Sequence, residues 1–257
     1  QMWYYRWWTL RKHIEKTSVG SAMTEFLVRR SYADKYNLIA SAVGHHIHES
    51  RWLRDYTYLD QIINTWFHGN NGKPMKKINA YSSWIASSIW SRYLVDGRKD
   101  VAIAMLPNLT WEYKQWDDHR WLETSFDRNG LKSNQNTLYW QYDVRDAMEE
   151  TLSGGRREKN ARPSINSYMY GNAKAIEHIA QLADDAAVAI LYRAKADSLK
   201  QMVQTRLWNK DSQFFEVLKP VYAPGSNIVV RDSFAHVREA IGFMPWYFNL
   251  PDDRSDF

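Results

Sequence analysis

Hydrophobic side chains recur at intervals of three and four along most of the chain, which is the period of an amphipathic helix. This pattern predicts helices over residues 35–53, 58–67, 82–94, 100–116, 164–183, 184–208 and 232–243. Gly69 follows the second helix as a stop signal, and Asp96-Gly97 closes the third. Pro107 predicts a bend, or the start of a second part, within 100–116. The sequence therefore predicts an all-α fold.

Strand signals are weak by comparison. Residues 214–218 and 228–230 are short apolar runs on either side of Pro224-Gly225, and they predict one short hairpin. We expect no sheet of consequence elsewhere.

The predicted helices come in pairs with short connections, about every 45 residues, which is typical of stacked helical hairpins. An open solenoid and a closed toroid both fit this pattern. No long polar linker divides the chain, so we expect a single domain over residues 1–257.

Aromatic content is the compositional anomaly. The chain holds 13 Trp, 16 Tyr and 9 Phe, or 15% of its residues. Core packing accounts for most such rings, but this excess of tryptophan favours a carbohydrate site, where flat rings stack on sugars. The chain has no cysteine, which excludes disulfides and Cys-ligated metals. A periplasmic or secreted location is favoured, although cysteine content does not settle it.

The net charge of +5 comes from 34 basic and 29 acidic residues spread along the chain. No basic stripe is evident, so we expect no nucleic-acid partner. The basic run of residues 156–162 is interpreted as a solvated loop. No apolar stretch is long enough to span a bilayer, so we expect no membrane partner.

Four acids lie close together in residues 140–150, and three of them compete for a catalytic role, namely Asp143, Asp146 and Glu149. Glycoside cleavage needs a protonated carboxylic acid at the leaving oxygen and a second carboxylate. Apolar neighbours such as Trp140 raise the pKa of a carboxyl group, and so do nearby acids. A raised pKa keeps the general acid protonated near neutral pH. The alternative is an acidic helix start, where Asp and Glu favour the helix dipole.

Another polar segment runs from Gly44 to Leu53 and includes His48-Glu49-Ser50-Arg51. A plain solvated helix face is one interpretation. A metal site is another, since His45 and Glu49 are four residues apart, but no third ligand is marked by spacing. We therefore expect no metal and no cofactor.

These segments, together with Tyr81-Ser82-Ser83-Trp84 and the run from Arg162 to Tyr170, resemble the six-hairpin glycosidases. That group holds trehalase, processing glucosidase I and mannosylglycerate hydrolase, and the resemblance covers nearly the whole chain, from Tyr4 to Pro251. Residues 127–131 are similar to the turn before the family's catalytic segment, although residues 132–137 form an insertion there.

The resemblance implies an (α/α)6 barrel, which we expect to be incomplete in this chain and truncated on its C-terminal side. It also implies a general acid in the 140–150 segment. Glu149, in Ala-Met-Glu, aligns best with the Gly-Met-Asp of processing glucosidases and ranks first. Asp146 ranks second. Asp143 ranks third, as the counterpart of the Gly-Trp-Asp of trehalases.

The family's aromatic–aspartate–serine signature, whose acid binds the sugar, corresponds to His48-Glu49-Ser50. The resemblance implies that a sugar pocket is lined by His48, Glu49, Arg51, Tyr81, Trp84, Trp140, Arg145 and Asn166. Trp84 has core packing as its alternative. The second carboxylate is expected beyond Phe257.

The predicted function is cleavage of a terminal glycosidic bond, with inversion, because the resembled families invert. The expected partner is an oligosaccharide or other glycoside. A carbohydrate-binding module without activity and a helical-repeat scaffold for a protein partner are the alternatives.

Overall fold

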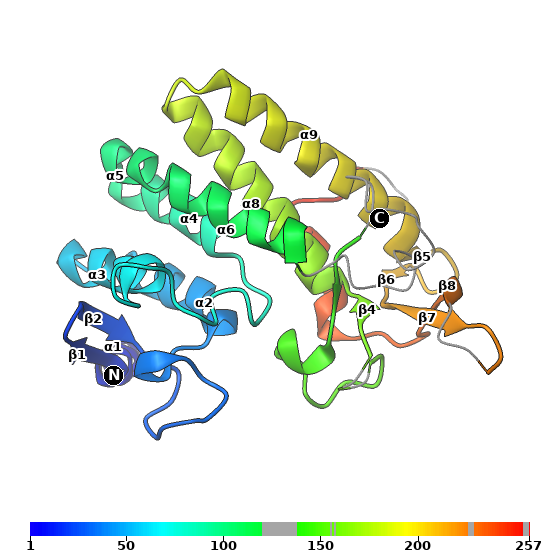
Figure 1. Cartoon of the computed structure of the whole chain (residues 1–257), viewed down its shortest axis with the longest axis horizontal. Helices are drawn as coiled ribbons and strands as arrows, with labels where there is room; N and C mark the ends of the chain where they lie inside the picture. The colour runs from blue at the N-terminus through cyan, green and yellow to red at the C-terminus, as the bar shows by residue number, and fades with distance from the viewer. Residues whose placement is uncertain (120–137, 155, 157, 226–228, 254–256) are drawn as a thin grey trace.

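The computed structural model describes residues 1–119, 138–154, 156, 158–225, 229–253 and 257. Helices dominate (Figure 1), and their bounds are α1 Met2–Lys12, α2 Ala40–Ser50, α3 Tyr56–His68, α4 Ile85–Asp96, α5 Lys99–Ala104, α6 Leu106–His119, α8 Pro163–Leu182, α9 Ala186–Met202 and α10 Met244–Tyr247. Short 3-10 turns are η1 Lys35–Asn37, η2 Asp143–Arg145 and η4 Ala240–Phe243, and a π-turn, η3 Val203–Leu207, extends α9.

The helices form successive pairs around a row made of α2, α4 and α8. Helix α4 packs against both α2 and α8, while α3 packs on α2 and α9 packs along α8. The arrangement follows from sequence, since the apolar faces of these helices meet in one continuous core that includes Ile47, Trp66, Ile85 and Ile176. The paired helices predicted by the periodicity are confirmed.

Helix α8 is the central element because it is buried along most of its 20 residues. It begins with Pro163, whose missing N–H costs nothing at a helix start. Asn172 of α8 donates to the Ser83 carbonyl at 3.2 Å and accepts from the Ser87 N–H at 3.1 Å. These bonds fix the beginning of α4 against the middle of α8.

Strands are more extensive than the sequence indicated. Sheet strands β3 Trp140–Gln141, β4 Asn160–Ala161, β7 Leu218–Tyr222 and β8 Val229–Phe234 form one antiparallel sheet in that order. Two further hairpins are β1 Ile14–Thr17 with β2 Gly20–Met23, and β5 Trp208–Asn209 with β6 Phe214–Phe215. The fold is therefore helix-rich rather than all-α.

The predicted hairpin around Pro224-Gly225 is confirmed, but its first strand is β7 and not residues 214–218. The helix predicted over 232–243 is wrong. Residues up to Phe234 extend β8 against β7, and only the 3-10 turn η4 follows. The apolar spacing of that segment is compatible with the period of a helix and with that of a strand. Pairing with β7 makes it a strand.

The single helix predicted over 35–53 is also wrong in its first part. Tyr36 and Asn37 have φ values of 60° and 61°, in the left-handed region, which ends η1 before α2 begins. Pro107 does begin a separate helix, as expected, since it is the second residue of α6. The stop signals at Gly69 and Gly97 are confirmed as C-caps of α3 and α4.

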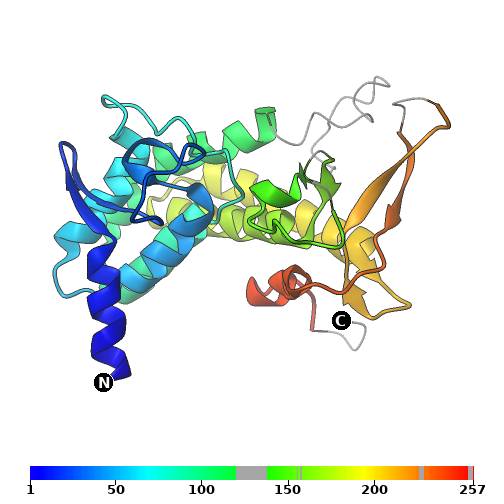
Figure 2. The ribbon, with the colours of Figure 1, turned by 90° about the horizontal axis from the view of Figure 1, so that it is seen from below.

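Helix α1 and the C-terminal segment containing α10 project from the same side of the helical body (Figure 2). Arg6 of α1 is ion-paired with Glu49 of α2. Phe248, just after α10, packs so closely on α8 that a Cβ at Gly171 would lie 2.3 Å from its ring. The C-terminal segment therefore packs on α8, whereas α1 buries none of its residues.

Gly44 is the residue of α2 on which the Trp84 indole rests. A Cβ built at Gly44 would lie 2.4 Å from Cε2 of Trp84, well inside van der Waals contact. Only glycine permits this approach, so α2 and α4 meet closely here.

Gly44→Ala is expected to destabilise the protein by about 1–3 kcal/mol, because overpacking outweighs the gain in helix propensity. Chemical denaturation measures the loss. In a Trp84→Leu background, which makes room for the methyl group, the same substitution should cost much less. An increase in stability in the wild-type background, as at an unconstrained helical glycine, would contradict this packing.

Candidate active site

The acid segment of residues 140–154 leaves β3, makes the turn η2 and returns toward β4. It is a turn rather than a helix start, so the helix-dipole alternative for its acids does not apply. Ala147, at its apex, has φ of 58°, a conformation that costs free energy for a residue with a Cβ. Such a turn persists only when its surroundings hold it, and three sets of bonds do so.

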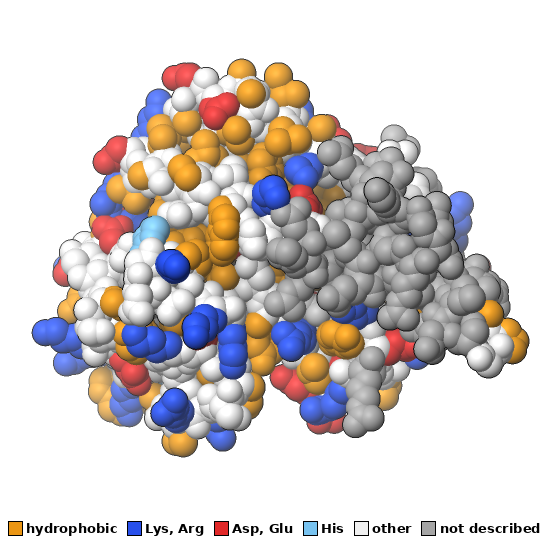
Figure 3. All heavy atoms as spheres, in the orientation of Figure 1, with side chains coloured by type: hydrophobic (Ala, Val, Ile, Leu, Met, Phe, Trp, Pro, Cys, Tyr) orange, Lys and Arg blue, Asp and Glu red, His pale blue; other side chains and the backbone are white. Residues whose placement is uncertain are grey.

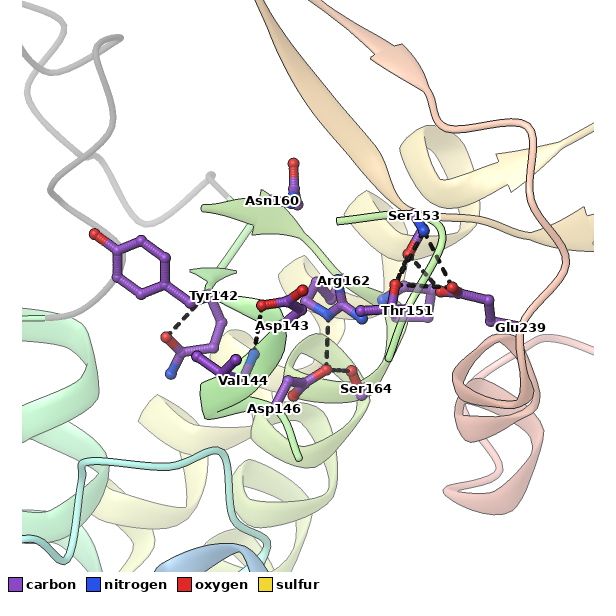
Figure 4. A network of polar contacts seen from close by, with 12 residues as sticks. Tyr142, Asp143, Val144, Asp146, Thr151, Ser153, Asn160, Arg162, Ser164 and Glu239 are labelled. Atoms are coloured by element: carbon purple, nitrogen blue, oxygen red, sulfur yellow. Dashed lines mark hydrogen bonds and ion pairs between the residues drawn. The ribbon is translucent and has the colours of Figure 1, made fainter. Parts of the chain in front are cut away.

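Asp146 provides the first attachment (Figure 4). Its Oδ2 accepts from Nε of Arg162 at 2.9 Å and from the Ser164 hydroxyl, and both side chains of the ion pair are fully buried. Burial raises the pKa of Asp146, while the Arg162 guanidinium opposes that rise. Asp146 is thus tied to the first turn of α8.

Asp143 provides the second, within the segment itself. Its carboxylate accepts from the Val144 N–H at 2.6 Å, and its carbonyl accepts from the N–H groups of Asp146 and Met148 at 2.9 and 3.0 Å. Asp143 is 3% exposed. Its oxygens therefore serve the turn and lie away from solvent.

Glu239 provides the third from the far side of the loop, as Figure 4 shows. Its Oε1 accepts from the Thr151 hydroxyl at 2.8 Å and from the N–H groups of Leu152 and Ser153 at 2.9 and 3.1 Å; the Ser153 hydroxyl bonds to Oε2. Burial favours a raised pKa for Glu239, but these hydrogen bonds lower it below the usual value. The lowered pKa favours the charged carboxylate, which holds residues 151–153 through these bonds.

Glu149 lies between these attachments and is exposed. Among the described residues, no hydrogen bond or ion pair involves its carboxylate. Tyr81 is its neighbour: burial raises the pKa of Tyr81, Arg145 opposes the rise, and the charge of Glu149 adds to it. The Arg145 guanidinium lies 6.0 Å from the Tyr81 ring and donates to the Ala80 carbonyl at 3.1 Å. Of the three acids, Glu149 is the one that is exposed.

An aromatic cluster adjoins this segment around Trp84. The Trp84 ring lies 4.6 Å from His48, 5.1 Å from His45, 6.4 Å from Tyr168 and 5.8 Å from Tyr247, measured between centroids. Asp146 and Tyr247 both act on the pKa of the Tyr168 hydroxyl, which burial raises. Tyr168 therefore joins the aromatic cluster to the acid segment.

Two polar atoms in this cluster are buried without a partner in the described part of the chain, namely Nε2 of His48 and Nε of Arg51. Burial lowers the pKa of His48 to about 4, with help from Arg51, so its imidazole is neutral at neutral pH. Buried polar atoms are nearly always bonded in native proteins. Both atoms are thus exceptions to that rule, and both lie beneath the surface of the protein.

Other predicted sugar-binding residues already have partners. Glu49 is ion-paired with Arg6, and its side chain is 41% exposed. Asn166 is fully buried and bonds to the backbone N–H and C=O of Tyr139 at 2.8 and 3.0 Å. Trp140 is buried in β3, and Trp84 is 4% exposed. Sugar contact by these four residues stays a prediction.

The structure brings His48, Arg51, Tyr81, Trp84, Arg145 and the three acids into one continuous region. Sequence reasoning missed Tyr168 and Tyr247, and it interpreted Arg162 as part of a solvated loop. It also missed Glu239, which is 85 or more residues from its partners and has no local signal. Residues 127–131 lie outside the described residues.

No three His, Cys, Asp or Glu side chains converge as a metal site would need, as far as the described residues extend. The His45–Glu49 alternative thus gains no third ligand there. Within the same residues, no helix has the length and apolar character that a membrane crossing requires.

Glu112 of α6 supports the loop that carries Tyr81. Its Oε1 accepts from Nε1 of Trp116 at 2.8 Å and from Nδ2 of Asn79 at 2.9 Å. The side chain is buried, and burial raises the pKa of Glu112 to about 7. The loop thus rests on a carboxyl that is protonated in mildly acid solution.

Because the folded state favours the neutral form of Glu112, its contribution to stability is full below a pH of about 4.5 and is lost as the pH rises through about 7. Urea unfolding at pH 5 and pH 8 should show the Glu112→Gln variant losing about 3 kcal/mol less stability over this interval than wild type. Glu150→Gln, at an exposed position, should follow wild type. Identical pH dependence in all three proteins would refute the assignment.

Comparison with known proteins gives one family. The sequence profile of the mannosylglycerate hydrolase MGH1-like glycoside hydrolase domain matches residues 35–256. A solved structure named "Sialidase" is 54% identical, with a TM-score of 0.88; the alignment covers 99% of this chain and 21% of that one. The chain therefore spans about one fifth of that relative.

More distant structures share the fold. A GH63 mannosylglycerate hydrolase from Thermus thermophilus, in complex with glucose, has a TM-score of 0.66 at 9% identity, covering 97% of this chain and 72% of that chain. An uncharacterised conserved protein from the same organism has a TM-score of 0.67 at 10% identity, with the same coverage.

Proposed function

Because the chain belongs to the mannosylglycerate hydrolase MGH1-like glycoside hydrolase domain family, we propose that it carries the general acid of a glycosidase and that this acid is Glu149. The observation that carries the proposal is that the three acids of this segment differ in their bonding and exposure. Asp143 and one carboxylate oxygen of Asp146 take part in bonds that shape the turn, and both residues are buried, whereas Glu149 stands exposed on it.

The proposed reaction is cleavage of a terminal glycosidic bond with inversion of configuration. Glu149 donates its proton to the leaving oxygen, while a second carboxylate activates water on the opposite face of the sugar, about 6.5–9.5 Å away. The relatives named above are longer than this chain. We infer that a region of the whole protein with no counterpart in residues 1–257 supplies that second carboxylate and the further walls of the pocket.

The sugar would lie between Glu149 and the aromatic cluster. Tyr247 is 57% exposed and offers a ring face to the sugar. Arg145 and Tyr81 stand on the other side, beside Glu149. The glucose-bound mannosylglycerate hydrolase of the same fold agrees with a monosaccharide-sized ligand.

In the whole enzyme, Glu149→Gln keeps shape but removes the transferable proton. It should slow hydrolysis of a glycoside with a poor leaving group by about 10²- to 10⁴-fold. An activated aryl glycoside, which needs little protonation, should lose far less. Steady-state kinetics on the two substrates measures the difference.

Glu150→Gln is the matched control, since Glu150 is the adjacent exposed acid, and it should retain full activity. Asp146→Asn should lower stability along with activity, because it breaks a buried ion pair. Intact turnover in Glu149→Gln, with activity abolished by Asp143→Asn or Asp146→Asn in a folded protein, would overturn the assignment.

A second candidate function is sugar binding without turnover. The observation in its favour is that Glu149 is exposed in this chain, whereas a general acid needs apolar walls. Binding of a glycoside by the whole protein with no product formed, even with an activated leaving group, would establish it.

A further inference from the structure

A cavity of about 680 Å³ lies in the N-terminal part of the chain, among residues separate from the acid segment and the aromatic cluster. Its size is in the range of small-ligand sites, about 300–1,000 Å³. Its wall is almost entirely one loop, the segment between β2 and α2. The lining residues are Glu15, Leu27, Arg29, Arg30, Ser31, Ala33, Asp34, Lys35, Tyr36 and Asn37.

The loop around this cavity is held in a defined shape. Nζ of Lys77 donates to the carbonyls of Ser31, Tyr32 and Ala33 at 3.3, 2.9 and 2.9 Å. The Asn37 amide accepts from the Arg30 N–H and donates to the Val28 carbonyl, both at 2.9 Å. The cavity is therefore preorganised, which lowers the cost of binding.

The cations of the wall are unneutralised. In the described part of the chain, Arg29, Arg30 and Lys35 take part in no ion pair, whereas the arginines at 92, 98, 162, 193 and 206 each contact a carboxylate. The adjacent Asp34 accepts from the backbone N–H groups of Lys35 and Lys77, so its carboxylate is used by the loop itself. The wall thus holds three cations against two carboxylates, Glu15 and Asp34.

Backbone strain is concentrated at the same place. Tyr36 and Asn37 are consecutive left-handed residues, a conformation that Asn adopts readily and that is unfavourable for Tyr. This conformation brings the Tyr36 ring to 4.6 Å from Nζ of Lys35. The Arg30 guanidinium lies 5.8 Å from the Phe26 ring. Cations and ring faces are thus presented together.

The surrounding surface has the same sign. Residues 1–38 hold seven basic and three acidic side chains, and residues 69–79 hold three basic and none acidic. Lys77 joins these two segments. Their combined net charge exceeds the net charge of +5 of the whole chain. Lys and Arg side chains gather over the lower left part of the face in Figure 3, where Figure 1 places these segments. The sequence did not reveal this patch, because folding brings the two segments together.

We propose that this cavity is a binding site for an acidic sugar, a saccharide unit that bears a carboxylate or a sulfate group. Guanidinium groups bind both anions bidentately, and the ring of Tyr36 offers an apolar face to the sugar. The choice of a sugar over other anions rests on the proposed glycosidase function. A nucleic acid would call for an extended basic stripe, whereas this site is a concavity lined almost entirely by one loop.

Isothermal titration of the 257-residue chain tests the proposal with four probes. They are tetragalacturonate, its neutral methyl ester, a sulfated carrageenan tetrasaccharide and its unsulfated agarose counterpart. At least one acidic probe should bind, and its neutral counterpart should bind at least about 10-fold more weakly, the value of one charge-assisted hydrogen bond. The carboxylated and sulfated probes distinguish the two anions.

The Arg29→Gln/Lys35→Gln double variant should weaken binding of the acidic probe by at least about 10-fold. Lys99→Gln/Lys210→Gln removes the same charge from two distant exposed positions and should change binding by less than about 2-fold. Circular dichroism of both variants should match wild type.

Equal weakening by the two double variants would overturn the proposal, since binding would then reflect overall charge. Absence of binding by every acidic probe, or equal binding of a single-stranded oligonucleotide that the Arg29/Lys35 variant also abolishes, would overturn it too. Glu149→Gln leaves this cavity unchanged, so failure here and failure of the proposed acid are separate results.

Discussion

The buried ion pair between Arg162 and Asp146 is the interaction on which the candidate site depends. Arg162 is fully buried at the start of α8, and Asp146 is 5% exposed at the end of η2. Removing one member of such a pair leaves a buried charge without compensation, at a cost of about 3–5 kcal/mol. The pair attaches the acid segment to the most buried helix of the protein. It is one of the three attachments that hold the segment in place.

The pair also explains how one short segment can hold acids that stabilise its shape and an acid that we propose to be catalytic. Asp143 closes the turn, Asp146 joins it to α8, and Glu239 clamps the returning strand of the loop. Ala147 takes a left-handed conformation between these points, and Glu149 is carried outward as a result. A general acid has to be placed within a fraction of an ångström of the bond it protonates. In the proposed site, the bonds that hold the turn do not use the carboxylate of Glu149.

Much of the helical framework was predictable because it depends on local periodicity. Helices α3 and α8 carry buried residues at helical spacing, and Gly69, Gly97 and Pro107 end or begin helices by backbone chemistry alone. The strand β8 was not predictable in this way, since its partner β7 decides its period. The left-handed conformation of Tyr36 and Asn37 was not predictable either, because the Asn37 side chain bonds to a loop seven or more residues earlier.

The candidate site was predictable as a segment but not in its internal roles. The family motif pointed to residues 140–150 and ranked Glu149 first by its Ala-Met-Glu context, but no local feature shows which of the three carboxyl groups are buried. Burial of Asp146 depends on Arg162, sixteen residues later, and the loop shape depends on Glu239, far along the chain. The run that contains Arg162 looked like solvated surface for the same reason. Long-range pairing of charges decides which acid is free.

The central claim is that Asp146 holds the acid segment in shape and that Glu149 does not. Amide hydrogen exchange in this segment, measured in wild type, Glu149→Gln and Asp146→Asn, tests this claim most directly. The amides of Asp146 and Met148 donate to carbonyls of the turn at about 3 Å and should be protected in wild type. The account predicts unchanged protection in Glu149→Gln and a marked loss at these two amides in Asp146→Asn, with α9 unaffected. Loss of protection in Glu149→Gln, or full protection in Asp146→Asn, would contradict it.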